Sequence, residues 1–184
     1  MKQPKDRIGC LNNFKTLIFM IKKSFVFVLL LLLGSTVWAQ ESVLPKVTIK
    51  TLDGKNFNTS EIYNDGKPMI LSFWALWCKP CQKELDAFMD NYEEWQEETD
   101  VKIFAVSIDD ARSTARVAPM AKSKGWDFEI LLDANGDFKR AMNVNLIPHT
   151  FLLDGNGKIV SQHTAYFEGA EYELYEKIKK LVGK

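Results

Sequence analysis

The residues best suited to chemistry are Cys78 and Cys81, because two thiols separated by two residues can form a reversible disulfide bond. They lie between an apolar segment, residues 69–74, and a long amphipathic one. The thiolate is the reactive form of cysteine, and a helix N-terminus stabilises negative charge through its unpaired N–H groups. We therefore expect Cys78, at the start of a helix, to attack a disulfide. Cys81, one turn later, is expected to resolve the mixed disulfide.

Three neighbouring residues are expected to support this pair. Lys79 places a positive charge near the thiolate and favours it. Pro80 suits the first helical turn, where a missing N–H costs nothing, and it stiffens the link between the sulfurs. Trp77 has two interpretations: an aromatic side chain that docks substrate peptides, or a cover over the dithiol.

A Cys-x-x-Cys pair can also supply half of a metal site or form a permanent structural disulfide. A structural zinc site normally has four ligands. The third cysteine, Cys10, precedes the domain, and His149 and His163 lie far along the chain at no metal-ligand spacing. We therefore predict redox chemistry, with no metal and no bound cofactor. His149 either tunes the thiolate or only opens a strand, and His163 is interpreted as structural.

The apolar patterns alternate between the periods of strands and helices, which predicts a layered α/β or α+β domain. Asp53 and Gly54 supply a tight turn for a leading hairpin. The segment after Cys81 has one apolar face, and acidic residues cover most of the rest, which predicts a solvated outer face. The predicted elements are a hairpin at 47–57, a strand at 69–74, a helix at 81–95, a strand at 101–108, a helix at 111–124, a strand at 128–132, a short helix at 137–142, hairpin strands at 149–154 and 158–164, and a helix at 168–182.

The first 39 residues predict an export signal. Residues 22–39 begin with lysines, continue with an apolar run at 25–33 and end with small residues. The run is shorter than the roughly 20 residues that a permanent membrane span needs, so cleavage before Gln40 is favoured over an uncleaved anchor. Met20 is the predicted true start, and residues 40–184 are one predicted domain.

The formal net charge of zero conceals an asymmetry. Six of the 24 Lys and Arg residues, but only one of the 24 Asp and Glu residues, lie in residues 1–39, which leaves an acidic domain. No cluster of Lys and Arg with interleaved aromatic residues occurs in this domain. A nucleic-acid partner is therefore not expected.

Residues 73–81, Phe-Trp-Ala-Leu-Trp-Cys-Lys-Pro-Cys, resemble the active-site segment of thioredoxins, and the similarity extends over residues 43–182. The export signal, the leading hairpin and the extra strand and helix at 101–124 resemble the TlpA/ResA-like branch of exported thiol–disulfide oxidoreductases. This resemblance implies an α/β thioredoxin fold. Its central mixed β-sheet is flanked by helices and carries an N-terminal β-hairpin and an inserted strand–helix unit.

The same resemblance implies roles for residues outside the cysteine motif. Pro148 matches the cis-proline that lies beside the dithiol, and the backbone of Ile147 is expected to pair with an incoming peptide. Ser72 replaces the buried aspartate of cytoplasmic thioredoxins, whereas Glu84 matches the glutamate that ResA-like reductases place near the dithiol. Glu84 lies one helical turn from Cys81 and is expected either to assist proton transfer or to be a solvated surface residue.

The activity that the resemblance implies is reduction of disulfides in exported proteins, with a membrane thiol reductant as electron donor. The implied location is the periplasm or the outer face of the cytoplasmic membrane, with membrane association only if the signal stays uncleaved. A disulfide oxidase or isomerase and a copper-delivery module on the same fold are alternatives. A peroxidase is disfavoured, because Ala75 stands where peroxiredoxins carry a threonine.

Overall fold

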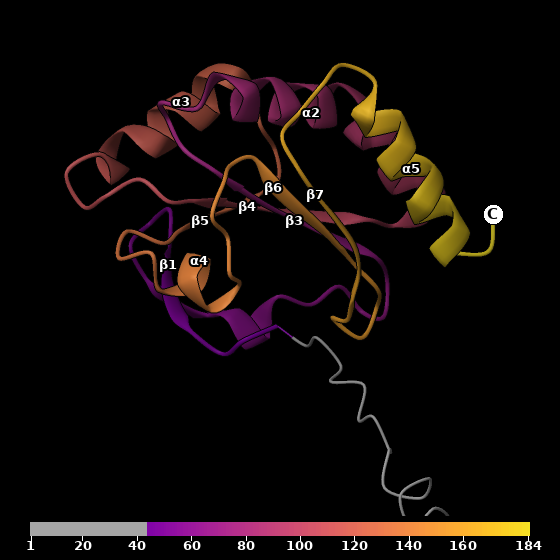
Figure 1. Cartoon of the computed structure of the whole chain (residues 1–184), viewed down its shortest axis with the longest axis horizontal. Coiled ribbons are helices and arrows are strands. Elements are labelled where there is room, and N and C mark those ends of the chain that lie inside the picture. The colour runs from indigo at the N-terminus through magenta and orange to yellow at the C-terminus, as the bar shows by residue number, and fades with distance from the viewer. Residues whose placement is uncertain (1–43) are drawn as a thin grey trace, which may run out of the picture. The chain divides into compact units, whose positions relative to one another are not determined.

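Figure 1 shows the computed structural model of the chain, which describes residues 44–184. The predicted signal segment, the start at Met20 and the cleavage point before Gln40 lie outside the described residues. The strands are β1 (Thr48–Thr51), β2 (Asn56–Asn58), β3 (Met69–Trp74), β4 (Lys102–Ser107), β5 (Glu129–Leu132), β6 (His149–Leu153) and β7 (Ile159–Thr164). The helices are α2 (Lys79–Thr99), α3 (Val117–Lys124), α4 (Asp137–Ala141) and α5 (Ala170–Leu181), with 3-10 turns η1 (Thr59–Glu61) and η2 (Thr114–Arg116).

All these strands form one mixed sheet in the order β2-β1-β5-β4-β3-β6-β7. The strands β3, β4 and β5 are parallel, and β6 runs antiparallel to β3. Every residue of β3 is buried, as expected for an apolar strand covered on both faces. The cysteine motif follows directly after β3, so the most buried strand of the sheet carries the predicted reactive segment.

Helices cover the two faces of the sheet unequally (Figure 1). The helices α2, α3 and α5 lie on one face, where a core cluster includes Trp74, Phe88 and Trp95. The short α4 lies on the other face, where a second cluster includes Phe73 and Phe138. Alternate residues of β3 therefore enter different clusters, as the period of a strand requires.

Two predicted helices begin later than expected. The helix predicted at 111–124 contains η2 and becomes α-helical only at Val117. Asp110 stops it from starting earlier, because its carboxylate and its carbonyl oxygen both accept the N–H of Ser113 and form a tight turn. The helix predicted from residue 168 begins at Ala170, after Gly169 with φ of 98°. The other predicted strands and helices are confirmed, with ends that differ by a few residues.

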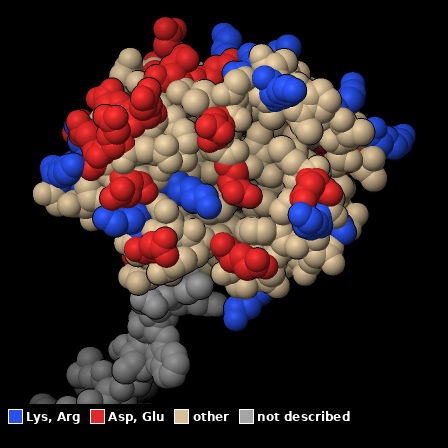
Figure 2. Space-filling view, turned by 180° about the vertical axis from the view of Figure 1, so that it is seen from behind, with Lys and Arg blue, Asp and Glu red and all other residues tan. Residues whose placement is uncertain are grey.

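The surface agrees with the acidic charge of the domain. The exposed residues of α2 include Asp90, Glu93, Glu94, Glu97 and Glu98. On the face drawn in Figure 2, Asp and Glu side chains gather toward one edge, whereas Lys and Arg stand singly or in small groups. None of the helices within residues 44–184 is long and apolar enough to cross a membrane.

Candidate active site

The predicted cysteine pair lies at the N-terminus of α2, in its oxidised form. Cys78 and Cys81 are joined by a disulfide, with their Cα atoms 5.3 Å apart. Cys78 is the N-cap residue, and its Sγ accepts the N–H of Cys81 at 3.3 Å. Pro80 lies in the first turn, where a backbone N–H has no partner within the helix, so its missing N–H costs no hydrogen bond. Both cysteines are buried, Cys78 with 5% of its surface exposed and Cys81 with none.

The loop between β3 and α2 is held by two side chains that sequence reasoning missed. The buried Asp109, just after β4, accepts the N–H of Leu76 at 2.9 Å, and Gln82 donates to the carbonyl of Leu76 at 2.7 Å. Both contacts fix the backbone that leads into Cys78. An aspartate directly after a buried strand was the available signal for Asp109. Nothing in the α2 pattern distinguished Gln82 from its exposed neighbours.

Apolar surface is available beside the cysteines. Trp77 is 70% exposed, which leaves most of its surface free to contact another molecule. Lys79 is also exposed. The Ile147–Pro148 peptide bond is cis, and Leu146, just before it, is 70% exposed. Leu146 was not singled out from the sequence. Substrate binding by Trp77, Ile147 and Pro148 stays a prediction.

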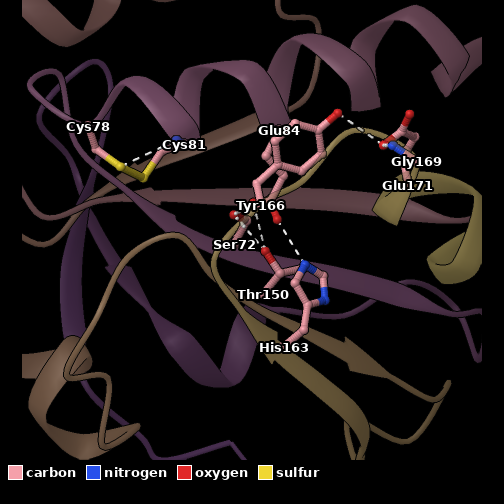
Figure 3. Close-up of polar contacts among 9 residues, drawn as sticks. All are labelled: Ser72, Cys78, Cys81, Glu84, Thr150, His163, Tyr166, Gly169 and Glu171. Atoms are coloured by element: carbon pink, nitrogen blue, oxygen red, sulfur yellow. Dashed lines mark hydrogen bonds and ion pairs between the residues drawn. A yellow bond between two sulfur atoms is a disulfide. The ribbon is translucent and has the colours of Figure 1, made fainter.

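Glu84 is fully buried, so its interpretation as a solvated surface residue is wrong. Its Oε2 accepts hydrogen bonds from Ser72 Oγ at 2.9 Å and from Thr150 Oγ1 at 2.8 Å. On the other side, Nε2 of His163 lies 2.9 Å from Oε1 (Figure 3). Glu84 follows Cys81 by three residues and therefore shares the sheet-facing side of α2 with it.

The three partners of Glu84 form one row across three strands. Ser72 of β3 is the register partner of Thr150 of β6, and Thr150 is the register partner of His163 of β7. Residues directly opposite each other on neighbouring strands point to the same face of a sheet. Sequence reasoning did not place Thr150 and His163 beside Glu84, because strand pairing is not visible in the sequence. The expectation that His163 serves only the strand overlooked its contact with Glu84.

His149 lies outside this row. Its Nε2 is 3.1 Å from Oε1 of Gln162, and its ring stacks on Phe151 with centroids 4.3 Å apart. Burial lowers the pKa of His149, and this effect outweighs the hydrogen bond to Gln162, which acts in the opposite direction. Within residues 44–184, no group of three or more His, Cys, Asp or Glu side chains is arranged to hold a metal ion.

Residues 41–162 match the AhpC/TSA family. The chain belongs to the AhpC/TSA family. The thiol-disulfide oxidoreductase ResA of Bacillus subtilis is similar to this chain. The two are 30% identical over 150 residues, which cover 76% of this chain and 81% of that protein. Relatives of this kind confirm the enzyme class predicted from the sequence, a thiol–disulfide oxidoreductase.

Solved structures confirm the predicted thioredoxin-like fold of this AhpC/TSA family member. A thioredoxin-like protein from Porphyromonas gingivalis is 54% identical, with a TM-score of 0.69 over 76% of this chain and 91% of that one. StoA from Bacillus subtilis is 28% identical, with a TM-score of 0.56 over 73% of this chain and 98% of that one. The leading hairpin β1–β2 and the β4–α3 unit are the predicted additions to this fold.

Replacing His149 with glutamine is expected to flatten the pH dependence of stability. In the unfolded chain the imidazole takes up a proton below about pH 6.5, whereas burial lowers its pKa in the folded protein and opposes protonation. The free energy of unfolding of the wild type should therefore fall as the pH drops from about 7 to 5, and that of the variant should fall less. Urea unfolding across this range measures both slopes, and equal slopes would contradict the assignment.

Proposed function

We propose that this protein is an exported disulfide reductase that uses the Cys78–Cys81 dithiol to reduce disulfides in extracytoplasmic proteins. The observation that carries the proposal is the placement of both sulfurs, bonded to each other, at the N-terminus of α2. A helix N-terminus favours the thiolate of the N-cap cysteine. The exposed Lys79 next to it adds a positive charge with the same effect. The family relationship supports thiol–disulfide exchange.

The reaction proceeds in two exchanges. The Cys78 thiolate attacks one sulfur of the substrate disulfide, forms a mixed disulfide and releases one substrate thiolate. Cys81 then loses its proton, and its thiolate attacks Sγ of Cys78 and releases the second substrate thiolate. Two electrons pass from the dithiol to the substrate, and the enzyme is left with the disulfide seen in the structure. A membrane thiol reductant returns the two electrons.

Glu84 accepts the proton that Cys81 loses. It lies one turn along α2, is shielded from water, and has hydrogen-bond partners on both carboxylate oxygens. An ionised carboxylate only accepts hydrogen bonds, and all three neighbouring side chains can donate to it. The carboxylate of Glu84 extends from α2 and accepts a hydrogen bond from Ser72 on β3. A helix residue therefore brings an acid next to the strand position at which cytoplasmic thioredoxins carry an aspartate.

Substrate peptides bind over Trp77 and the Ile147–Pro148 segment, and the backbone of Ile147 pairs with the peptide. The exposed ring of Trp77 and the exposed side chain of Leu146 supply apolar contact area on this surface. Pro80 keeps the two sulfurs close while the substrate is attached. The signal segment predicted in residues 1–39 delivers the protein to the periplasm or the outer face of the cytoplasmic membrane.

The roles of the two cysteines are separated by single substitutions. Cys78→Ala should abolish reduction of insulin disulfides, because no other described side chain supplies the attacking sulfur. Cys81→Ala should accumulate mixed disulfides between Cys78 and substrate, because the resolving thiol is missing. Non-reducing gels and a turbidity assay measure the two effects. Ser123→Ala, which replaces an exposed residue of α3, is the control and should keep full activity, whereas full turnover by Cys78→Ala would refute the mechanism.

The reduction potential separates a reductase from an oxidase or isomerase. Dithiols on this fold range from about −270 mV for thioredoxin to about −120 mV for DsbA. We expect the Cys78–Cys81 couple to lie at about −250 mV or below, measured by equilibration with glutathione or dithiothreitol and thiol alkylation. A value near the DsbA end would instead favour the oxidase. A peroxidase lacks support, because Ala75 has no hydroxyl to hold a peroxide.

Glu84→Gln is expected to slow the resolving step by about 100-fold, which is at the lower end of general acid–base contributions. The amide keeps the size of the side chain but cannot take up the proton of Cys81. Stopped-flow oxidation of the reduced enzyme by a disulfide peptide measures this step. Glu93→Gln, an exposed residue on the same helix, is the matched control and should react at the wild-type rate. Equal rates for both variants would remove Glu84 from the mechanism.

A further inference from the structure

We propose that His163 relays protons between the buried carboxyl of Glu84 and solvent, through a small cavity between β7 and α5. This inference rests on the proposed function, because it gives the proton of Cys81 a way out of the core. His163 contacts neither sulfur and acts through Glu84, so it is a positioning residue that also conducts protons.

The proposed proton route begins at the carboxylate of Glu84, which has no access to water. Glu84 has no exposed surface, and its Oε2 is occupied by the hydroxyls of Ser72 and Thr150. Only Oε1 faces a titratable partner, Nε2 of His163 at 2.9 Å. The side chain of His163 is 28% exposed, whereas that of Glu84 is 0% exposed. The imidazole therefore bridges a buried acid and the protein surface (Figure 3).

The exposed side of His163 borders a cavity of about 60 Å3 that is also lined by Glu173 and Lys177 of α5. A single water needs about 10–15 Å3 of such space, so this cavity can hold water next to the ring. Its lining includes none of the residues proposed to bind substrate, such as Trp77 and Pro148. Protons can therefore leave by this route while a substrate peptide covers the cysteines.

Other titratable groups around the pair have their own partners or face another side. The hydroxyl of Tyr166 donates to Oε2 of Glu171 at 3.0 Å, and burial together with this bond raises the pKa of Tyr166, so it stays a neutral donor. Glu171 also accepts the N–H of Gly169 at 3.1 Å. His149 contacts Gln162 on the other face of the sheet. Among the described residues, His163 is thus the titratable side chain in direct contact with Glu84.

The proton transfers balance over the catalytic cycle. During substrate reduction Cys81 gives its proton to Glu84, and the Glu84 carboxyl passes it to Nε2 of a neutral His163 that carries its proton on Nδ1. The resulting imidazolium releases the Nδ1 proton to water in the cavity. The oxidised enzyme then has Nε2–H donating to an ionised Glu84, which matches the contact seen beside the disulfide. The same transfers run in reverse when Cys81 is reprotonated.

The test compares His163→Ala, His163→Gln and a control in stopped-flow oxidation of the reduced full chain by a disulfide peptide. His163→Ala should slow the resolving step by about 10-fold or more, and added imidazole should restore the rate in a saturable, pH-dependent way. His163→Gln keeps a side chain that can donate to Oε1 but cannot relay, so it should be slow and unrescued. Gln162→Ala, the next residue on β7 and on the opposite face, should react at the wild-type rate.

Each outcome decides the proposal. A wild-type rate for either His163 variant, or a slow His163→Ala that imidazole does not rescue, would overturn the relay and leave His163 a structural partner of Glu84. Thermal unfolding of each variant shows whether the fold persists, and His163→Gln reports on the relay if His163→Ala unfolds. The proposed function fails separately, through full activity of Cys78→Ala, whereas a wild-type rate of Glu84→Gln would overturn the relay and leave the dithiol mechanism in place.

Discussion

Glu84 lies between α2 and the sheet with no exposed surface, a position that a carboxylate tolerates only when its oxygens are hydrogen-bonded. The bonds come from three neighbouring strands, through Ser72, Thr150 and His163. This one side chain therefore ties the helix that carries the cysteines to β3, β6 and β7. Removing His163 would leave Oε1 of this buried carboxylate without its donor, which costs more than one ordinary hydrogen bond contributes, whereas Oε2 would keep one donor if either Ser72 or Thr150 were removed.

The cysteines and the carboxylate depend on the same helix in different ways. Cys78 uses the free N–H groups at the N-terminus of α2, where its Sγ accepts the N–H of Cys81. Glu84 uses the sheet-facing side one turn further on, where water is excluded. A helix that begins beyond the carboxyl end of β3 meets both needs, because its first turn follows the end of that strand and Glu84, in its second turn, contacts side chains of the sheet. Asp109 and Gln82 hold the connecting loop in register with this helix.

The polar row surrounds an acid that comes from the helix and not from a strand of the sheet. Ser72 of β3 carries no charge, and its hydroxyl donates to the helix glutamate. The same carboxylate contacts His163 on β7 through its other oxygen. An acid held by the helix and bordered by an edge strand has a short route toward solvent that avoids the face where peptides are proposed to bind.

Much of this arrangement follows from local sequence. The apolar run of β3, the Cys-x-x-Cys spacing, the amphipathic period of α2 and the turn glycines each depend on neighbouring residues, so the order of elements and the placement of Cys78 and Cys81 were predictable. The start of α3 was not, because Asp110 forms a turn that competes with the helix. The environment of Glu84 depended on strand register, which pairs Ser72 with Thr150, 78 positions away in the chain, and Thr150 with His163. Only the tertiary structure sets that register, and for this reason His163 and Thr150 looked like ordinary strand residues until the sheet brought them to the same carboxylate.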